Sequence, residues 1–277
     1  MGDSQRETLN KHGFRFNKQF GQNFISDKNL LSAIVSDAGV TSDDTVVEVG
    51  AGAGALTYEL ATVAKKVISY EIDKNLKSVL EEKLKVFDNV ELIFADALKE
   101  SEEEISRRAG GVFKLVANLP YYITTPLIFK FLEMPVKSIT VLVQKEVAER
   151  MCAKAGDDAY GVLSVGIALF GTARITRIVK RQMFYPVPDV DSALVNITFD
   201  SKLTTEQRKA VREVVKTAFA MRRKTLYNNL RANYGGETSA NALERAKIDA
   251  SARAETLTLD DYVKLSEILS ETAKDKR

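Results

Sequence analysis

The sequence is poor in the side chains that build disulfides, zinc sites and nucleophilic catalytic pairs. Among its 277 residues, Cys152 is the only cysteine and His12 is the only histidine. This scarcity excludes disulfide frameworks, clustered zinc ligands and Ser/His or Cys/His catalytic pairs within the fold. A structural or incidental role is the default interpretation of both residues, and we expect no metal.

A long apolar run is also missing. No stretch approaches the roughly 20 apolar residues that span a bilayer, and the polar residues 1–7 do not form the apolar core of a secretory signal. Hydrophobic residues still make up 45% of the chain, which is enough for a real core. We therefore expect a globular cytoplasmic protein that is a monomer and has no membrane partner.

A strong overall charge is absent too, because the formal net charge is only +2. The charges are unevenly placed, however: residues 101–104 are acidic, whereas residues 173–181 and 221–231 carry cations and no acid. Such one-signed stretches suit the phosphate backbone of a nucleic acid, although solvated faces of a strand and a helix give the same pattern. The candidate RNA-binding residues are Arg174, Arg177, Arg181, Arg222, Arg223 and Lys224.

From about residue 45 onward, short β-rich apolar runs alternate with amphipathic stretches. This pattern predicts βα units and a parallel sheet. The expected strands are 45–50, 67–72, 90–95, 114–119 and 138–144, and the expected helices are 28–37, 54–64, 74–86 and 124–132. Residues 173–179 and 192–199 read as an antiparallel pair that finishes the sheet.

Beyond residue 200 the β pattern ends and several helices are expected, with Gly235-Gly236 as the clearest break between them. Residues 1–14 are too polar and aperiodic to pack. We therefore predict a flexible segment at 1–14, an α/β domain at 15–200 and a helical domain at 201–277.

A glycine-rich turn follows the first strand of the predicted sheet. In Val49-Gly50-Ala51-Gly52-Ala53-Gly54 the glycines let the backbone approach a nucleotide-like ligand at a helix N-terminus. Spacing alone leaves the ligand open, because Gly50, Gly52 and Ala55 also fit a dinucleotide pattern, and a tight turn without a ligand is a further alternative. Glu71, nineteen residues after Gly52, could accept hydrogen bonds from ribose hydroxyls.

The residues that follow the next two strands reduce the number of ligands that the glycine-rich turn could bind. Asp96 follows one strand and could accept from an adenine amine, while Asn118-Leu119-Pro120-Tyr121 follows the other. An amide oxygen, a rigid ring and an aromatic face can together hold a flat base that carries an amine. A nicotinamide enzyme would need a hydride-transfer partner, and we find no histidine in the expected folded region and no suitable Tyr-x-x-x-Lys pair.

Six motifs in this order resemble those of the ribosomal RNA adenine dimethyltransferases of the KsgA type. Two of them lie near the ends of the resemblance: Phe16 to Phe24 is similar to the F-G-Q-N-F signature, and Phe219 to Leu230 is similar to the F-x-x-R-R-K-x-L-x-N-x-L helix. The other motifs are Glu48 to Gly52 with Glu71, Asp96, Asn118 to Tyr121, and the F-x-P-x-P-x-V-x-S element at Phe184 to Ser192. Ala51 and Tyr122 depart from the proline and the asparagine that are frequent in this family.

The resemblance implies S-adenosylmethionine as cofactor and small-subunit ribosomal RNA, within a pre-ribosomal small subunit, as partner. It also implies a Rossmann-like class I methyltransferase sheet with a small all-helical C-terminal domain. The candidate cofactor-binding residues are Asn23, Ile25, Gly50, Gly52, Glu71, Ile72, Asp96, Ala97 and Asn118.

The candidate catalytic residues are Asn118, Leu119, Pro120, Tyr121 and Phe184. We expect the Asn118 side-chain oxygen and the Leu119 carbonyl to accept the two hydrogens of an adenine amine, which directs the nitrogen lone pair at the methyl donor. Tyr121 would stack on the base and Phe184 would form a second aromatic wall. A core position at a proline turn is the alternative for Phe184, and buried pairing with acids between the domains is the alternative for Arg222 and Arg223.

Three rival functions stay open. An erythromycin-resistance type methyltransferase of large-subunit RNA typically has isoleucine where Leu119 stands. A ribosome assembly factor that acts mainly by binding would keep the fold but would not require intact catalytic positions. DNA or protein methyltransferases with an Asn/Asp-Pro-Pro-Tyr motif are disfavoured, because Leu119 replaces their first proline.

Overall fold

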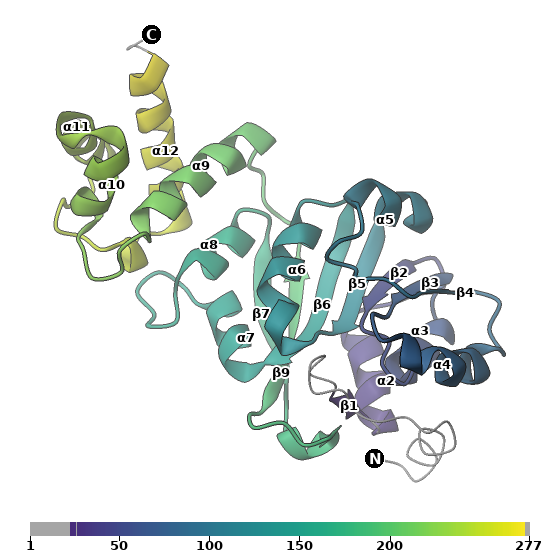
Figure 1. Ribbon diagram of the computed structural model, residues 1–277. Coiled ribbons are helices and arrows are strands. Elements are labelled where there is room, and N and C mark those ends of the chain that lie inside the picture. Colours follow the sequence, from purple (N-terminus) through teal and green to yellow (C-terminus); the bar gives the residue numbers. More distant parts are fainter. Residues whose placement is uncertain (1–22, 26, 275–277) are drawn as a thin grey trace. The chain divides into compact units, whose positions relative to one another are not determined.

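The computed structural model describes residues 23–25 and 27–274 (Figure 1). His12, the predicted flexible segment 1–14 and most of the F-G-Q-N-F motif lie outside the described residues. The described chain forms two compact units, one from residues up to 148 together with 174–198, and the other from 149–173 together with 199–274. None of the helices in the described ranges has the length and apolarity needed to cross a membrane.

The first unit is built on a seven-stranded sheet of order β4-β3-β2-β5-β6-β9-β7. The strands from β4 to β6 in this order are parallel, and β9 pairs antiparallel with β6. This is the doubly wound arrangement with an antiparallel addition that the strand spacing predicts, so the Rossmann-like fold class is confirmed. The strands are β2 (Thr45–Val49), β3 (Lys66–Tyr70), β4 (Val90–Ile93), β5 (Phe113–Asn118), β6 (Val136–Gln144), β7 (Thr172–Val179) and β9 (Ser192–Thr198).

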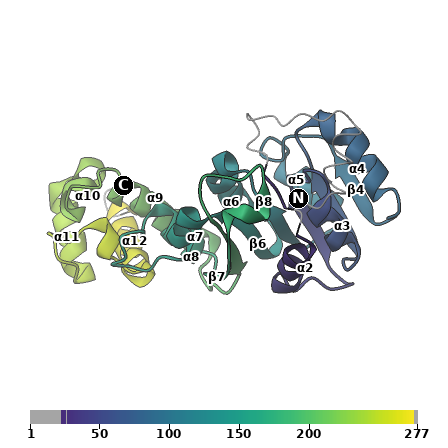
Figure 2. The same cartoon turned by 90° about the horizontal axis from the view of Figure 1, so that it is seen from below.

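Helices cover both faces of this sheet (Figures 1 and 2). Successive strand residues point to opposite faces, and Val46, Val116 and Leu142 share one core cluster with apolar residues of α2 and α3. Because their neighbours Val47 and Leu115 are also fully buried, the other face is covered as well. The helices of this part of the chain are α2 (Lys28–Asp37), α3 (Ala55–Ala61), α4 (Lys77–Leu84), α5 (Glu102–Ala109), α6 (Thr124–Leu132) and α7 (Lys145–Cys152), with short 3-10 turns η2 (Lys74–Leu76), η3 (Tyr121–Ile123) and η4 (Arg181–Met183).

Helix α5 falls in the acidic stretch for which the sequence pattern predicted no helix. Ser101 caps it by accepting a hydrogen bond of 3.1 Å from the Glu104 amide. Three glutamates lie in its first turn and two arginines in its last, which is the charge order that a helix dipole favours. Charge and capping, with only Ile105 and Ala109 buried, therefore define this helix.

A two-stranded sheet joins distant parts of the chain beside the glycine turn. Strand β1 (Phe24–Ile25) pairs antiparallel with β8 (Phe184–Tyr185). The pairing places Phe24 against Tyr185 and Ile25 against Phe184. The N-terminal motif and the F-x-P-x-P-x-V-x-S element are therefore hydrogen-bonded neighbours.

The second unit consists of helices around its own core, with buried residues such as Val214, Leu230 and Leu265. Its helices are α8 (Val162–Ala168), α9 (Thr205–Ala218), α10 (Leu226–Tyr234), α11 (Gly236–Ala246) and α12 (Leu259–Lys274), with the 3-10 turn η5 (Ala254–Thr256). A Thr204/Gln207 capping box starts α9.

The chain enters this helical unit twice, because residues 149–173 belong to it together with the residues after 198. The Tyr160 hydroxyl donates a hydrogen bond of 2.9 Å to the Leu257 carbonyl. The Phe219 ring lies 6.5 Å from the ring of Tyr160 and 6.3 Å from that of Tyr262. These contacts explain why residues 149–173, which the sequence assigned to the α/β domain, cluster with the helices.

Candidate functional site

A cavity of about 260 Å³ opens at the carboxyl ends of β2, β3 and β5 and beside the segment after β4. In open α/β sheets, ligands bind at this edge. The cavity brings together eleven of the sequence-predicted catalytic and cofactor residues. They are Asn23, Gly50, Gly52, Glu71, Ile72, Asp96, Ala97, Asn118, Leu119, Pro120 and Tyr121.

The glycine turn needs its glycines for backbone conformation and for space. Gly50 has φ 85° and its amide donates 2.8 Å to the Tyr70 carbonyl. Gly52 has φ 55°, and a Cβ atom there would lie 2.9 Å from the Phe24 ring. Any larger residue at Gly52 would therefore push against strand β1 and strain the backbone.

Glu71 connects this turn to the end of β3. Its Oε2 accepts a hydrogen bond of 2.7 Å from the Gly52 amide, and its Oε1 accepts one of 2.9 Å from the Asp73 amide. Burial raises the pKa of Glu71, and the backbone amides oppose this rise. A carboxylate oxygen can accept more than one hydrogen bond, so Glu71 can hold the turn and also accept from ligand hydroxyls.

Glu48 lies beneath the turn, and sequence reasoning gave it no role of its own. Its Oε2 accepts hydrogen bonds of 2.6 Å from both Thr57 and Ser69, which ties β2 to α3 and β3. Its Oε1 is buried and has no partner among the described residues. Burial raises the pKa of Glu48 to about 7. The sequence marked this position as an acid inside the apolar run Val46-Val-Glu-Val and as the first residue of the Glu48 to Gly52 motif.

Asn118 has an amide whose orientation is fixed by its surroundings. Its Nδ2 donates a hydrogen bond of 3.0 Å to the main-chain carbonyl of Asn23. Since a carbonyl can only accept, the amino group must face Asn23, and Oδ1 is the atom left to accept from another group. Pro120 follows with φ −57°, which starts the turn into η3.

Tyr121 and Phe184, the two aromatic residues that the sequence assigned to the target base, lie in different surroundings. Tyr121 lines the cavity, and its hydroxyl is 2.9 Å from the buried Ser192 Oγ. Phe184 is 3% exposed and packs in the core cluster with α2, as its alternative interpretation anticipates. It does not line the cavity, so its role as a second wall stays a prediction. Ile25, the partner of Phe184, lines a smaller cavity of about 30 Å³ beside the glycine turn.

The candidate RNA-binding cations fall into two groups. In the first unit, Arg177 forms two hydrogen bonds of 3.0 Å to Asp37, and Arg181 donates to the Asp189 carbonyl at 3.1 Å. Arg174 is exposed. The charge of Arg177 is therefore already compensated by an acid that the sequence pattern did not reveal.

The second group is the basic loop, which we define as Arg222, Arg223 and Lys224 between α9 and α10. All three side chains are exposed, and none forms an ion pair with another described residue of the helical unit. Asn229 holds the start of the loop by donating to the Ala218 and Met221 carbonyls at 2.6 and 3.2 Å. The loop thus presents three cations on an anchored backbone.

The described part of the chain contains no candidate metal-binding site. Residues 23–25 and 27–274 contain no cluster of three or more His, Cys, Asp or Glu side chains that could hold an ion.

Comparison with known proteins gives a consistent result. A family model described as Ribosomal RNA adenine dimethylase matches residues 13–271. The Ribosomal RNA small subunit methyltransferase A of Bacillus licheniformis is 42% identical over 278 residues, which cover 96% of this chain and 95% of that protein.

Two solved structures share the fold over most of the chain. A dimethyladenosine transferase from Plasmodium falciparum has a TM-score of 0.73 and 28% identity, covering 91% of this chain and 98% of that one. The 23S rRNA methyltransferase ErmE has a TM-score of 0.71 and 28% identity, covering 90% of this chain and 100% of that one.

Proposed function

The chain belongs to the ribosomal RNA adenine dimethylase family, and we propose that it dimethylates the exocyclic amine of adenosines in small-subunit ribosomal RNA with S-adenosylmethionine as methyl donor. Two adjacent adenosines near the 3′ end of that RNA are the proposed targets, within a pre-ribosomal small subunit. The observation that carries the proposal is the fixed amide of Asn118 at the edge of the cavity. Its Nδ2 is held by Asn23, which leaves Oδ1 to accept from an amine.

The cavity supports the cofactor assignment. Glu71 accepts from ribose hydroxyls and Asp96 from the adenine amine, since both carboxylates line the cavity. S-adenosylmethionine, when bound, supplies a methyl group on a positively charged sulfur that an amine can attack. Bound at this edge, its methyl group would lie near Asn118.

The chemical demand on the protein is to localise a lone pair that is otherwise delocalised into the adenine ring. In this proposal the Asn118 Oδ1 and the Leu119 carbonyl accept the two amine hydrogens, and Tyr121 stacks on the base. Positioning then supplies much of the acceleration. No general base is required, because the methylated ammonium is acidic enough to lose its proton to water.

The basic loop supports a ribosomal RNA partner. We expect Arg222, Arg223 and Lys224 to contact phosphates, so replacing all three with alanine should reduce the slope of log affinity against log salt by about 2 to 3. Arg107→Ala is the matched control, because its charge is already paired with Glu104 at 2.7 Å. An unchanged slope in the triple variant would remove the loop from the interface.

Two rivals are distinguished by one assay. The 42% identity to a small-subunit methyltransferase, over 96% of this chain, supports the proposed substrate. Purified protein should be incubated with labelled S-adenosylmethionine and unmodified small subunits, large subunits, naked RNA or DNA, followed by nucleoside analysis. Dimethyladenosine in small-subunit RNA supports the proposal, label in large-subunit RNA supports the rival enzyme, and binding without label supports an assembly factor.

A further inference from the structure

Two consecutive tyrosines enter the cavity, and only the first has an anchored hydroxyl. Tyr121 contacts Ser192, whereas no described residue hydrogen-bonds the hydroxyl of Tyr122. Both belong to the 3-10 turn η3. With three residues per turn, neighbouring side chains point about 120° apart, so the two rings serve different parts of the cavity.

Tyr122 is also one of two unusually exposed apolar side chains in the cavity. Among the large hydrophobic residues that the described chain exposes, only Ile72, at 40%, and Tyr122, at 55%, line this cavity. Ile72 follows β3 and Tyr122 follows β5, on either side of the end of β2. An aliphatic and an aromatic side chain left exposed within a cavity are suited to the two faces of a flat ring.

Tyr122 lines the cavity together with the two acids Glu71 and Asp96. Burial raises the pKa of the Tyr122 hydroxyl, and the Asp96 and Glu71 carboxylates add to this rise. These are the two acids assigned to the adenine amine and the ribose. Tyr122 therefore shares the cavity with the groups that would hold adenosine, while the anchored Tyr121 is left for the target base.

We propose that Tyr122 is a cofactor-binding residue that covers the adenine of S-adenosylmethionine, with Ile72 on the opposite face of the ring. The inference rests on the proposed function, since it takes the cavity as the S-adenosylmethionine site. Tyr122 thus acts as an aromatic cover, in a position where an asparagine would have no ring to offer.

The absence of tryptophan from the chain allows a direct test. Tyr122→Trp introduces a single indole at the proposed adenine face. Its emission should be quenched by S-adenosylhomocysteine and by 5′-methylthioadenosine, which both carry adenine, and should not respond to methionine. Emission that ignores both adenosyl ligands, although calorimetry shows that they bind, would overturn the inference.

Affinity measurements on two variants distinguish the contribution of the Tyr122 ring to binding from that of its hydroxyl. Loss of one base-stacking aromatic weakens binding by roughly 10-fold or more, so Tyr122→Ala should weaken both adenosyl ligands to this extent. Tyr122→Phe should stay within about 3-fold of the wild type, because it keeps the ring. Tyr58→Ala, which removes a 37% exposed tyrosine outside the cavity, is the matched control.

The failure modes are distinguishable. If wild-type protein and the control variant bind S-adenosylhomocysteine but Tyr122→Ala binds it equally well, the inference fails and the proposed function stands. The inference fails equally if Tyr122→Ala raises only the KM for ribosomal RNA, because the ring would then contact the target. If the wild-type protein does not bind S-adenosylhomocysteine at all, the proposed function fails first.

Discussion

The two ends of the parallel strands use acidic side chains in opposite ways. At the amino ends, Asp44 and Glu91 pair with cations: Asp44 lies 2.9 Å from Lys114 and Glu91 lies 2.9 Å from Lys66. At the carboxyl ends, Glu48 and Glu71 accept hydrogen bonds from hydroxyl and amide groups and form no ion pair among the described residues. The same sheet therefore carries acids paired with cations at one end, and two acids held by neutral donors at the other.

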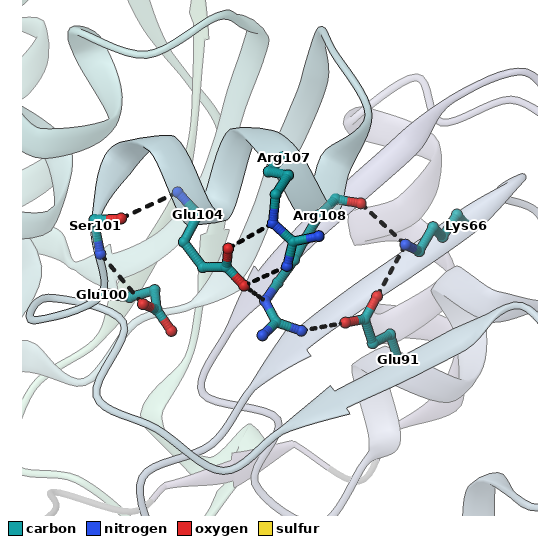
Figure 3. Close-up of polar contacts among 7 residues, drawn as sticks. All are labelled: Lys66, Glu91, Glu100, Ser101, Glu104, Arg107 and Arg108. Carbon is teal, nitrogen blue, oxygen red and sulfur yellow. Dashed lines mark hydrogen bonds and ion pairs between the residues drawn. The ribbon is translucent and has the colours of Figure 1, made fainter.

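Figure 3 shows the amino-end arrangement beside α5. Lys66 contacts Glu91 and also donates 3.0 Å to the Arg108 carbonyl, while Arg108 contacts both Glu91 and Glu104. Hydrogen bonds from Lys66 and Arg108 lower the pKa of Glu91 against the effect of burial. Each acid in this network is satisfied by the protein itself, so the network is suited to joining α5, β3 and β4.

The difference between the acids at the two strand ends indicates at which end a ligand is expected to bind. Burial would raise the pKa of Asp44, but hydrogen bonds from Lys114 and Thr41 outweigh it and lower the pKa. For Glu71 burial prevails and the pKa is raised. Asp44 is thus paired internally, whereas Glu71 at the cavity keeps capacity for an outside donor. The predictions below test this division, from the largest expected effect to the smallest.

Asn118→Ala should give the largest functional effect at the carboxyl end. It removes the acceptor proposed for the amine, so we expect turnover to fall on the order of 100-fold or more. Asn118→Asp should also be impaired, because a carboxylate oxygen would face the Asn23 carbonyl in place of the amino donor. Single-turnover methylation of small subunits measures both variants, and near-normal turnover for Asn118→Ala would contradict the proposed mechanism.

Lys114→Met should give the largest stability effect at the amino end. Among the described residues it leaves the exposed Lys137 as the cation paired with the buried Asp44, whose hydrogen bonds from Thr41 remain, and breaking a buried pair in this way costs about 3 kcal/mol. Urea unfolding measures the loss, and the Lys114→Met/Asp44→Asn double variant should recover part of it. Affinity for S-adenosylhomocysteine should not change. A stable single variant, or one with weakened cofactor binding, would break the division between the two ends.

Glu48 and Glu91 should give opposite pH dependences. Glu48 has a pKa of about 7 in the folded protein against 4.5 in its reference state, so between these values only the folded form keeps the proton. Its contribution to stability is therefore lost as pH rises through this window, by roughly 3 kcal/mol at most. For Glu91, whose pKa is lowered, the contribution is present above the unfolded pKa and is lost as pH falls through the folded pKa.

Urea unfolding of wild-type protein and Glu48→Gln between pH 5 and 8 isolates the first effect. The free energy of unfolding of the wild type should fall relative to that of the variant as the pH rises. A difference that stays constant across this range would show that Glu48 is ionised throughout.

Glu71→Gln should lower both ligand affinity and stability. The variant keeps the shape of the side chain but removes charge-assisted hydrogen bonds to the ribose, so affinity for S-adenosylhomocysteine should fall roughly 10-fold or more. Stability should fall by about 1 to 3 kcal/mol, because the new amino group replaces one of the two oxygens that accept from the Gly52 and Asp73 amides and would face a donor. Calorimetry and urea unfolding on the same samples test both statements, and an unchanged affinity or an unchanged stability would contradict them.

The sequence predicted what is encoded locally. Each parallel strand is a short apolar run, and the cavity residues Glu71, Asp96 and Asn118 each follow one of these runs. Parallel strands bring their carboxyl ends to one edge, so order along the chain was sufficient to assemble the site. Helix 28–37 was likewise predicted with the bounds that α2 has.

Features that depend on contacts between residues far apart in the sequence could not be predicted from local sequence patterns. The β1–β8 pairing joins two-residue strands, and Arg177 meets Asp37 across 140 positions of sequence. The buried position of Phe184 follows from the first of these pairings. Side-chain capping and ion pairs define α5 rather than apolar periodicity, so a pattern based on hydrophobic spacing missed it.

Lys66→Met should give the smallest effect and thereby set the scale of the comparison. Lys66 and Glu91 are 38% and 34% exposed, and ion pairs exposed to this extent contribute up to about 1 kcal/mol. Arg108 still contacts Glu91 in the variant, so the carboxylate is not left alone. We expect a loss within that limit in urea unfolding, smaller still in high salt, with unchanged cofactor affinity. If Lys66→Met instead weakened S-adenosylhomocysteine as much as Glu71→Gln does, the amino-end network would position the cavity, and the two ends could not be treated as separate.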